Sequence, residues 1–142
     1  MKLFLELREV ARVVHALVET PGEFRRDGLR RNAFVRQRGE DRALRAFFNV
    51  CRHRGAQLVE EPCGRLRGAI GCPCHAWTYA LDGRLAGIPE SASFGDVDKA
   101  THGLTPLPAG ERHGMIFIRL SPGAPLEIDV DAHLAGLGED FA

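Results

Sequence analysis

Two short stretches decide how this chain is interpreted: CRHRGA at residues 51–56 and CPCHAWTY at residues 72–79. Each stretch places a cysteine close to a histidine. The two pairs are Cys51 with His53 and Cys72 with His75. Two thiolates and two imidazoles form the ligand set of a 2Fe–2S centre in which two His replace two Cys on one iron. A structural zinc ion also accepts two Cys and two His, although its sites usually contain a Cys-x-x-Cys pair. The residues alone leave zinc, or no metal, as the alternatives.

The residues around these two motifs extend the pattern and point to a family. Gly55 and Ala56 follow the first pair, and an aromatic run followed by Leu-Asp-Gly at residues 81–83 follows the second. Here the chain resembles the Rieske domain of the ring-hydroxylating, non-haem iron oxygenases, over about Val13–Phe141 and most closely over Phe47–Arg84.

The second motif also departs from the usual pattern of that family, which is C-P-Y-H-G-W. This chain has Cys74 in place of the tyrosine and Ala76 in place of the glycine. Both differences leave the predicted ligands in place.

The resemblance implies a fold, a cofactor and a function. It implies a mainly β fold, a small antiparallel β-sandwich with a cluster-binding lobe. It implies one Rieske 2Fe–2S cluster, with Cys51 and Cys72 on one iron and His53 and His75 on the other. The function expected from it is one-electron transfer. A reductase or ferredoxin would donate the electron, and an oxygenase catalytic domain or subunit would accept it, in an oligomer or a single chain.

Two aromatic residues after the second motif bear on the reduction potential of such a centre. Tyr79 lies four residues beyond His75, where its hydroxyl can bond a cluster thiolate and raise the potential. Trp77 occupies a position where high-potential members of the family have a serine. Its presence therefore favours the low-potential, oxygenase-type class, with plain packing under the cluster loop as the alternative role.

Cys63 and Cys74 are left over from the predicted ligand set. High-potential Rieske proteins link their two cluster loops by a disulfide, but here Ala56 occupies one of the two positions that it needs. We therefore expect Cys63 and Cys74 to be free, buried or half-buried thiols in a reducing cytosol. A bridge between Cys63 and Cys74 is the alternative.

The catalytic iron of such oxygenases is held by two His and one carboxylate, and the chain offers no clear set of this kind. Asp98 with His102, and Asp131 with His133, each lack a second His at helical spacing. We assign no catalytic residue and expect that this chain alone does not oxygenate a substrate.

Two other functions stay open from the residues. A stand-alone Rieske ferredoxin is disfavoured by the extra segment Phe94–Phe141. A zinc-stabilised or metal-free interaction module is the alternative of a different class.

Length and composition are those of one soluble globular domain. The chain has 142 residues, of which 44% are hydrophobic and 27% charged, as is usual for such domains. No apolar run approaches the about 18 residues of a membrane span, and Glu6, Arg8 and Glu9 interrupt the apolar start where a signal peptide would continue. We expect a cytoplasmic protein without membrane contact. No nucleic-acid-binding motif accompanies the arginines, so no nucleic-acid partner is expected.

The hydrophobic pattern changes along the chain. Apolar residues spaced by three and four predict a helix over Lys2–Val18. Short strands with tight turns follow, and Asp27-Gly28 and Asp82-Gly83 are typical of hairpins. A short amphipathic helix is predicted over Asp131–Phe141. The predicted strands are Ala33–Arg38, Ala43–Val50, Leu66–Gly71, Trp77–Leu81, Arg84–Gly87 and Met115–Leu120.

We therefore expect three parts in the chain. Residues 1–20 form an atypical N-terminal segment. Residues 21–125 form the Rieske domain, with its cluster lobe at about 47–87. Residues 126–142 form a tail that would lead to a catalytic domain absent from this sequence.

Overall fold

The computed structural model describes residues 10–14, 19–28 and 34–134. Clustering of contacts divides the chain into two compact units. One unit is the continuous stretch Val18–Thr105. The second unit combines Met1–Leu17 with Pro106–Ala142.

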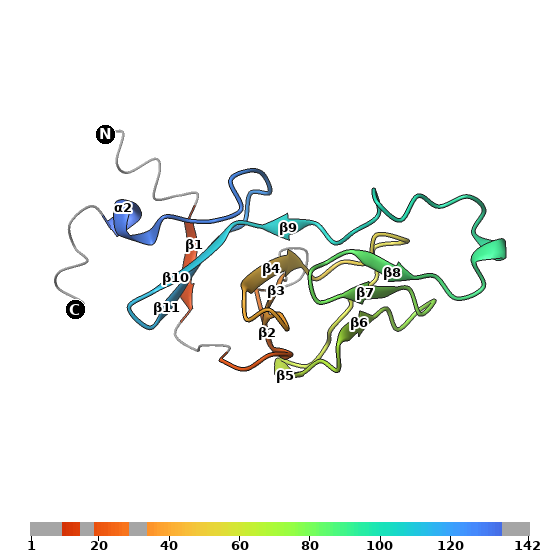
Figure 1. Ribbon diagram of the computed structural model, residues 1–142, viewed down its shortest axis with the longest axis horizontal. Coiled ribbons are helices and arrows are strands. Elements are labelled where there is room, and N and C mark those ends of the chain that lie inside the picture. The colour runs from red at the N-terminus through yellow and green to blue at the C-terminus, as the bar shows by residue number, and fades with distance from the viewer. Residues whose placement is uncertain (1–9, 15–18, 29–33, 135–142) are drawn as a thin grey trace. The chain divides into compact units, whose positions relative to one another are not determined.

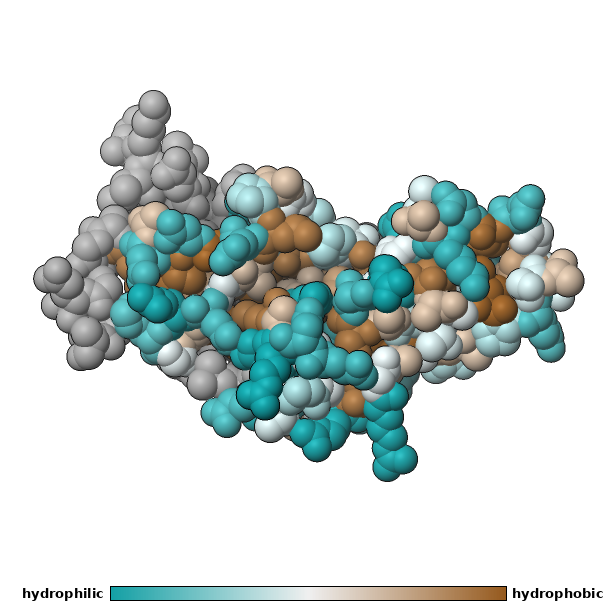
Figure 2. All heavy atoms as spheres, viewed as in Figure 1, coloured by the Kyte–Doolittle hydropathy of each residue, from teal (hydrophilic) through white to brown (hydrophobic). Residues whose placement is uncertain are grey.

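The first sheet of the Val18–Thr105 unit is antiparallel. It contains β2 (Glu23–Asp27), β3 (Phe34–Arg38), β4 (Leu44–Phe48) and β5 (Cys63–Arg65), in the order β5-β2-β3-β4. Asp27 pairs with Phe34, so β2 and β3 are an antiparallel pair, as Asp27-Gly28 predicted, but residues 28–33 connect them in place of a tight two-residue turn. On the face that Figure 2 shows, hydrophilic side chains gather over β2 and β5, and Arg65 at the end of β5 is exposed.

A smaller antiparallel sheet forms the second half of this unit. It contains β6 (Ala69–Gly71), β7 (Thr78–Ala80) and β8 (Leu85–Gly87), in the order β6-β7-β8 (Figure 1). Gly83, in the turn between β7 and β8, has a φ of 91°, and a Cβ at this position would overlap the ring of Phe47. The predicted Asp82-Gly83 turn is confirmed, and it requires glycine for both reasons.

One apolar core joins the two sheets of this unit. Its buried members include the following: Phe24, Val35 and Phe47 from the first sheet, Ile70, Tyr79 and Leu85 from the second, and Cys51, Leu58, Val59, Cys72, Trp77, Leu81 and Leu104 from the connections. Burying a large apolar side chain stabilises a fold by about 1.5–3 kcal/mol. Gln37 on β3 is also fully buried, and its side-chain amide donates a hydrogen bond to the carbonyl of Leu81. The core therefore connects the sheets through both apolar packing and a polar contact.

The second unit has its own antiparallel sheet. Its strands are β1 (Val10–Val14), β11 (Met115–Arg119) and β10 (Ala109–Arg112), in the order β1-β11-β10. β9 (Pro106–Leu107) and the helix α2 (Val130–Leu134) belong to the same unit. Ile116, Phe117 and Ile118 of β11 are buried.

The predicted N-terminal helix over Lys2–Val18 is wrong for Val10–Val14, which form β1 and pair with β11. Three of these five residues are valines, whose branched side chains favour strands over helices. The other residues of that prediction lie outside the described ranges. The C-terminal helix is confirmed for Asp131–Leu134, although it begins at Val130, and the remainder of that prediction also lies outside them.

The six predicted strands are all present, most of them one to three residues shorter than expected. β2 was implied only by the Asp27-Gly28 dipeptide. β5, β9 and β10 were not predicted. They read Cys-Gly-Arg, Pro-Leu and Ala-Gly-Glu-Arg, and glycine, proline and glutamate are depleted in strands. Among the described residues, no helix is long and apolar enough to cross a membrane.

Candidate metal centre

Two loops of the Val18–Thr105 unit carry the four predicted ligands. Loop 1 (residues 51–56) follows β4, and loop 2 (residues 72–77) joins β6 to β7. Both loops have the same backbone hydrogen bonds. The amide of Cys51 donates to the carbonyl of Ala56 at 2.8 Å, and the amide of Gly55 donates to the carbonyl of Cys51 at 3.0 Å. In loop 2 the amide of Cys72 donates to Trp77 at 2.8 Å, and that of Ala76 to Cys72 at 3.0 Å.

The fifth residue of each loop has a left-handed backbone, with a φ of 74° at Gly55 and 53° at Ala76. The two loops differ in the place of the histidine. His53 is the third residue of loop 1, whereas His75 is the fourth residue of loop 2. The two loops therefore share one backbone geometry but carry their histidines at different positions within it.

The two cysteines of these loops lie together in the core. Cys51 is 2% exposed and Cys72 is 4% exposed. Burial raises the pKa of the Cys51 thiol, and the neighbouring Cys72 thiol raises it further through a hydrogen bond and its charge. Two buried thiols in contact are costly to ionise together without a cation, and a bound metal removes that cost because it deprotonates a coordinating thiol.

The two histidines lie together near the surface. Their ring centroids are 4.7 Å apart, with the rings at 79°. His53 is half-buried and His75 is exposed. Burial lowers the pKa of His53, and the charges of His75 and Arg54 lower it further. A lowered pKa favours the neutral imidazole, which is the form that binds metals.

The hydroxyl of Tyr79 lies where the sequence predicted it. It is 3.3 Å from Sγ of Cys51 and accepts a hydrogen bond from the backbone amide of Arg52 at 3.0 Å. Tyr79 is fully buried, and burial, followed by its bond to Cys51, raises the pKa of the phenol. A neutral hydroxyl is thus held beside one of the two buried thiols.

Trp77 packs beneath the loops, as expected of the packing role, and its link to the low-potential class stays a prediction. It is 2% exposed, and its ring stacks on that of His53 with centroids 5.0 Å apart and an angle of 13°. Its Nε1 is buried and has no hydrogen-bond partner among the described residues. The ring of Phe94, from the segment after β8, stands edge-on to both His53 and Trp77.

Asn49 is a further residue of the site that sequence reasoning missed. Its side chain is 2% exposed and makes three hydrogen bonds to backbone beyond loop 1. Oδ1 accepts from the amides of Leu58 and Val59 at 3.1 and 2.9 Å, and Nδ2 donates to the carbonyl of Val59 at 2.7 Å. The available signal was an asparagine directly after the apolar Phe47-Phe48, two residues before the first predicted ligand.

Cys63 and Cys74 are free, as predicted, but both are exposed rather than buried or half-buried. Cys63 begins β5, whose three residues are all exposed, and Cys74 lies within loop 2. No disulfide links Cys63 to Cys74.

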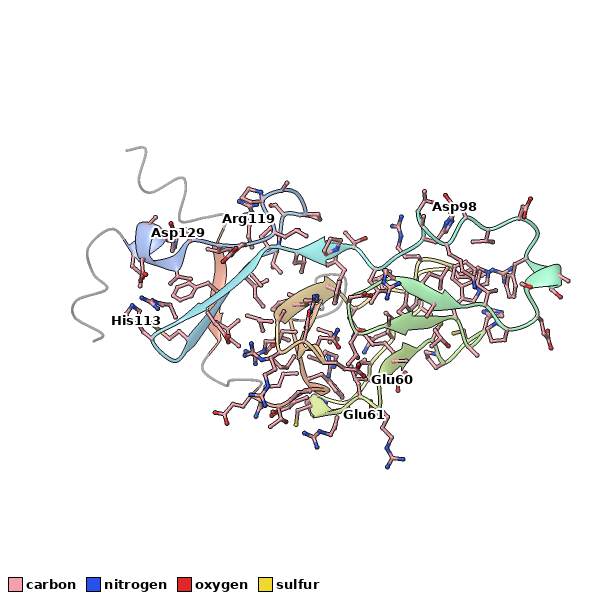
Figure 3. The ribbon with its side chains drawn as sticks, in the orientation of Figure 1. Glu60, Glu61, Asp98, His113, Arg119 and Asp129 are labelled. Carbon is pink, nitrogen blue, oxygen red and sulfur yellow. The ribbon has the colours of Figure 1, made fainter. Side chains whose placement is uncertain are left out.

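The other candidate pairs from the sequence do not form a second centre among the described residues. Nδ1 of His102 contacts the backbone carbonyl of Asp98, labelled in Figure 3, rather than its carboxylate. Asp131 pairs with Arg112 and His113. Within the described part of the chain, no three His, Cys, Asp or Glu side chains converge on the position of a single metal ion.

The donor set of the two loops suits a binuclear cluster. A cluster with two irons needs a pair of thiolates and a separate pair of imidazoles, and loops 1 and 2 supply both pairs. The thiol pair is buried and the imidazole pair is nearer the surface. A tetrahedral zinc ion needs all four donors around one point instead.

The family model that matches this chain is that of the Rieske [2Fe-2S] domain, over residues 12–108. The carnitine monooxygenase oxygenase subunit of Escherichia coli (strain K12) is 40% identical over 106 residues, which are 75% of this chain and 27% of that protein. The glycine betaine monooxygenase oxygenase subunit of Chromohalobacter salexigens is 36% identical over 111 residues, or 78% of this chain and 24% of that protein. The chain thus spans about a quarter of the length of these curated relatives.

Solved structures agree with the sequence matches. The quaternary ammonium Rieske monooxygenase CntA superposes with a TM-score of 0.80 and 32% identity, over 93% of this chain and 36% of that chain. A naphthalene 1,2-dioxygenase matches with a TM-score of 0.74 and 25% identity, over 94% and 31%. The mainly β, antiparallel fold predicted from the sequence is therefore confirmed.

Proposed function

Because this chain belongs to the Rieske [2Fe-2S] domain family, whose members bind one Rieske cluster and transfer electrons through it, we propose that Cys51, His53, Cys72 and His75 are its four ligands. The cysteines would hold one iron and the histidines the other. The observation that carries the proposal is the matched pair of loops, which bring the two thiols together in the core and the two imidazoles together above them.

The cluster, when bound, accepts and releases one electron at a time. The residues of this chain set the conditions for that chemistry. Burial of Cys51 and Cys72 keeps water from the thiolates. The hydroxyl of Tyr79 lies 3.3 Å from Sγ of Cys51, where it would donate to an iron-bound thiolate, stabilise added negative charge and raise the potential.

The exposed ring of His75 supports a direction for electron exit. His53 is half-buried and is stacked on Trp77, whereas His75 is exposed on the same side of the loops. Electrons would therefore pass to the acceptor through His75, the ligand that an approaching protein surface can contact.

The partners follow from the relatives and are part of the proposal. A 2,4-dinitrotoluene dioxygenase large component of Burkholderia sp. (strain RASC) is also 34% identical over 117 residues, or 80% of this chain and 26% of that protein. Relatives named for carnitine, glycine betaine and dinitrotoluene thus share this stretch at similar identity. That pattern supports a common electron-transfer role, with a reductase or ferredoxin as donor and an oxygenase catalytic domain or subunit as acceptor.

Metal analysis of protein purified without oxygen tests the ligand assignment. We expect two irons and two acid-labile sulfides per chain, with a red-brown colour. Replacing any one of Cys51, His53, Cys72 or His75 with Ala should lose the colour, whereas Cys63→Ser and Cys74→Ser should keep it. Stoichiometric zinc without sulfide, or loss of the cluster in the two serine variants, would contradict the proposal.

A second measurement tests the absence of oxygenase activity in this chain alone. Substrate-dependent oxygen consumption is expected to be nil when the reduced protein is mixed with carnitine or glycine betaine, because the described residues contain no set of two His and one carboxylate that could hold a catalytic iron. Turnover by the purified chain would overturn this part of the proposal.

A further inference from the structure

The segment between β8 and Leu104 forms a third side of the proposed cluster site. This cap segment, Ile88–Gly103, contains a short 3₁₀ turn, η2 (Ser91–Ser93), and is visible beyond β8 in Figure 1. Its far end is fixed where the amide of Leu104 donates to the carbonyl of Gly83 at 2.8 Å. Lys99 fixes its middle, because Nζ donates to the carbonyl of Ala86 at 3.2 Å.

The apolar residues of the cap segment face the core. Ile88, Phe94 and Val97 are each partly buried and pack against the core cluster that contains Cys51 and Cys72. The amide of Phe94 donates to the carbonyl of Ser91 at 3.0 Å, which places Phe94 directly after the turn η2. The position of its side chain is therefore set by backbone bonds and by packing together.

The ring of Phe94 touches both proposed iron-binding imidazoles. Its centroid is 5.0 Å from that of His53 and 6.2 Å from that of His75, edge-on in each case at 88° and 85°. It is also 5.8 Å from the ring of Trp77. His53 therefore has an aromatic wall on two sides, the stacked Trp77 and the edge-on Phe94, and an apolar ring occupies space that water would otherwise fill.

An apolar wall at this position acts on the reduction potential. Two ferric ions, two sulfides and two thiolates sum to no net charge, so the reduced centre carries one negative charge that the oxidised centre lacks. Surroundings of low polarity disfavour the charged state. Excluding water from the imidazole of His53 therefore makes the electron harder to add, in the same way that solvent exposure tunes other iron–sulfur centres.

We propose that Phe94 is a shielding residue that lowers the reduction potential of the bound cluster by excluding water from His53, the half-buried member of the imidazole pair. This inference rests on the proposed function, since it needs the two histidines to be ligands. It assigns to the cap segment a role that the four ligands and Tyr79 do not supply.

The test compares reduction potentials of the cluster-loaded protein at one fixed pH. Phe94→Ala is expected to shift the equilibrium toward the reduced state by roughly tenfold, which is about 59 mV for one electron. Phe94→Leu keeps an apolar side chain and should shift it much less. Val97→Ala is the matched control, because it removes apolar contact from the same segment without removing the ring, and should leave the potential unchanged.

A spectroscopic measurement separates shielding from a merely structural effect. In D₂O, deuterium coupling to the reduced centre in pulsed electron paramagnetic resonance should increase in Phe94→Ala and stay at the wild-type value in Val97→Ala. An unchanged potential and unchanged coupling in Phe94→Ala, with the cluster retained, would overturn the proposal. An equal shift in Val97→Ala would also overturn it, because any loosening of the segment would then suffice.

A second pair of variants decides the matter if Phe94→Ala does not hold the cluster. Phe94→Gln keeps much of the volume but is polar, so its potential must lie above that of Phe94→Leu, and equal potentials would refute shielding. These outcomes differ from failure of the proposed function, in which the wild-type protein itself would contain no 2Fe–2S cluster.

Discussion

Loop 1 and loop 2 have the same internal hydrogen bonds but are anchored in different ways. Loop 2 is the tip of a hairpin, because Gly71 pairs with Thr78 directly below it and the ladder of β6 and β7 continues from there. Loop 1 leaves β4 at Phe48, and the described chain does not return as a paired strand until β5 begins at Cys63. No strand pairing among the described residues holds the chain there. Instead, the side chain of Asn49 makes three hydrogen bonds to the backbone of Leu58 and Val59.

The difference shows that one loop geometry can rest on many backbone bonds or on a few side chains. Loop 1 depends on Asn49 and on Tyr79, whose hydroxyl reaches across from β7 to Cys51 and Arg52. Loop 2 depends mainly on the strands that flank it. Side-chain substitutions should therefore damage loop 1 more than loop 2, and the following variants test this asymmetry.

The largest effect is expected from Asn49→Leu. The substitution leaves the buried amides of Leu58 and Val59 without partners, and each such group costs about 1–3 kcal/mol. The carbonyl of Val59 loses one of its two side-chain donors and keeps its bond from Gln57. We expect a loss of about 3–5 kcal/mol in the free energy of unfolding, together with a fall in iron content. Chemical denaturation and iron analysis measure both.

Thr78→Val is the matched control in loop 2. The hydroxyl of Thr78 donates to the carbonyl of Ala76 at 3.0 Å, so this substitution also removes a side-chain bond that braces a loop. Because the ladder of β6 and β7 remains, we expect a cost of about 1 kcal/mol or less. Equal losses in Asn49→Leu and Thr78→Val would show that the two loops are anchored alike.

The next largest effect is expected from Tyr79→Phe. The change removes the hydroxyl that bonds Sγ of Cys51 and leaves the amide of Arg52 without its partner. We expect a loss of about 1–2 kcal/mol in stability and a potential lower by roughly 60 mV, since one hydrogen bond of about 1.4 kcal/mol corresponds to that shift for one electron. Potentiometry of the loaded protein measures it, and an unchanged potential would remove Tyr79 from the tuning of the site.

Substitutions at the fifth residue of each loop are expected to change the free energy of unfolding in opposite directions. Gly55→Ala places a methyl group in open space, so its cost is that of a left-handed backbone, about 1 kcal/mol. Ala76→Gly relieves the same strain in loop 2 and should stabilise the protein by about 0.5–1 kcal/mol after the entropy of glycine is counted. Thermal unfolding of the two variants checks the pair, and a destabilised Ala76→Gly would show that the loops are not equivalent in this respect.

The smallest effect is expected from acid, at the turn between β3 and β4. The hydrogen bond from Arg45 lowers the pKa of Asp41 from 3.8 to about 2. Because the folded-state pKa is the lower one, this contribution to stability is present above pH 3.8 and is lost as the pH falls from there toward 2. Asp41→Asn should lack that loss, as acid titration of the two proteins can show. If the acid unfolding curve of the wild-type protein matched that of Asp41→Asn, the Asp41–Arg45 pair would not contribute to stability.

Much of this fold follows from local sequence signals. The hairpin of β7 with β8 is closed by the Asp82-Gly83 turn, and Asp27-Gly28 lies at the end of β2, before the connection to β3. Both dipeptides act on neighbouring residues only. The four predicted ligands are brought together in one unit because their motifs flank short strands of the same core. Their identity as ligands stays a prediction that metal analysis must test.

The features that the sequence did not predict depend on distant contacts. The pairing of β1 with β11 joins segments roughly a hundred residues apart, and no spacing within Val10–Val14 contains that information. The burial of Asn49 likewise depends on the placement of residues 58 and 59, to which its side chain bonds. The exposure of Cys74 depends on its position in loop 2, at the tip of the hairpin of β6 and β7. Cysteine is usually among the most buried residue types. The residue type alone therefore predicted burial for Cys74, whereas the structure exposes it.

The pairing of β1 with β11 also has a consequence for the order in which the chain folds during synthesis. The unit that holds loops 1 and 2 is continuous and is complete once Thr105 has left the ribosome. The sheet of the second unit needs β1, which precedes the first unit in the sequence, and β11, which follows it. Pairings between distant segments form slowly, and domains tend to fold as they emerge. We therefore expect the first unit to fold before β1 pairs with β11. Pulse-labelling of backbone amides during refolding would then find β2, β3 and β4 protected before β1.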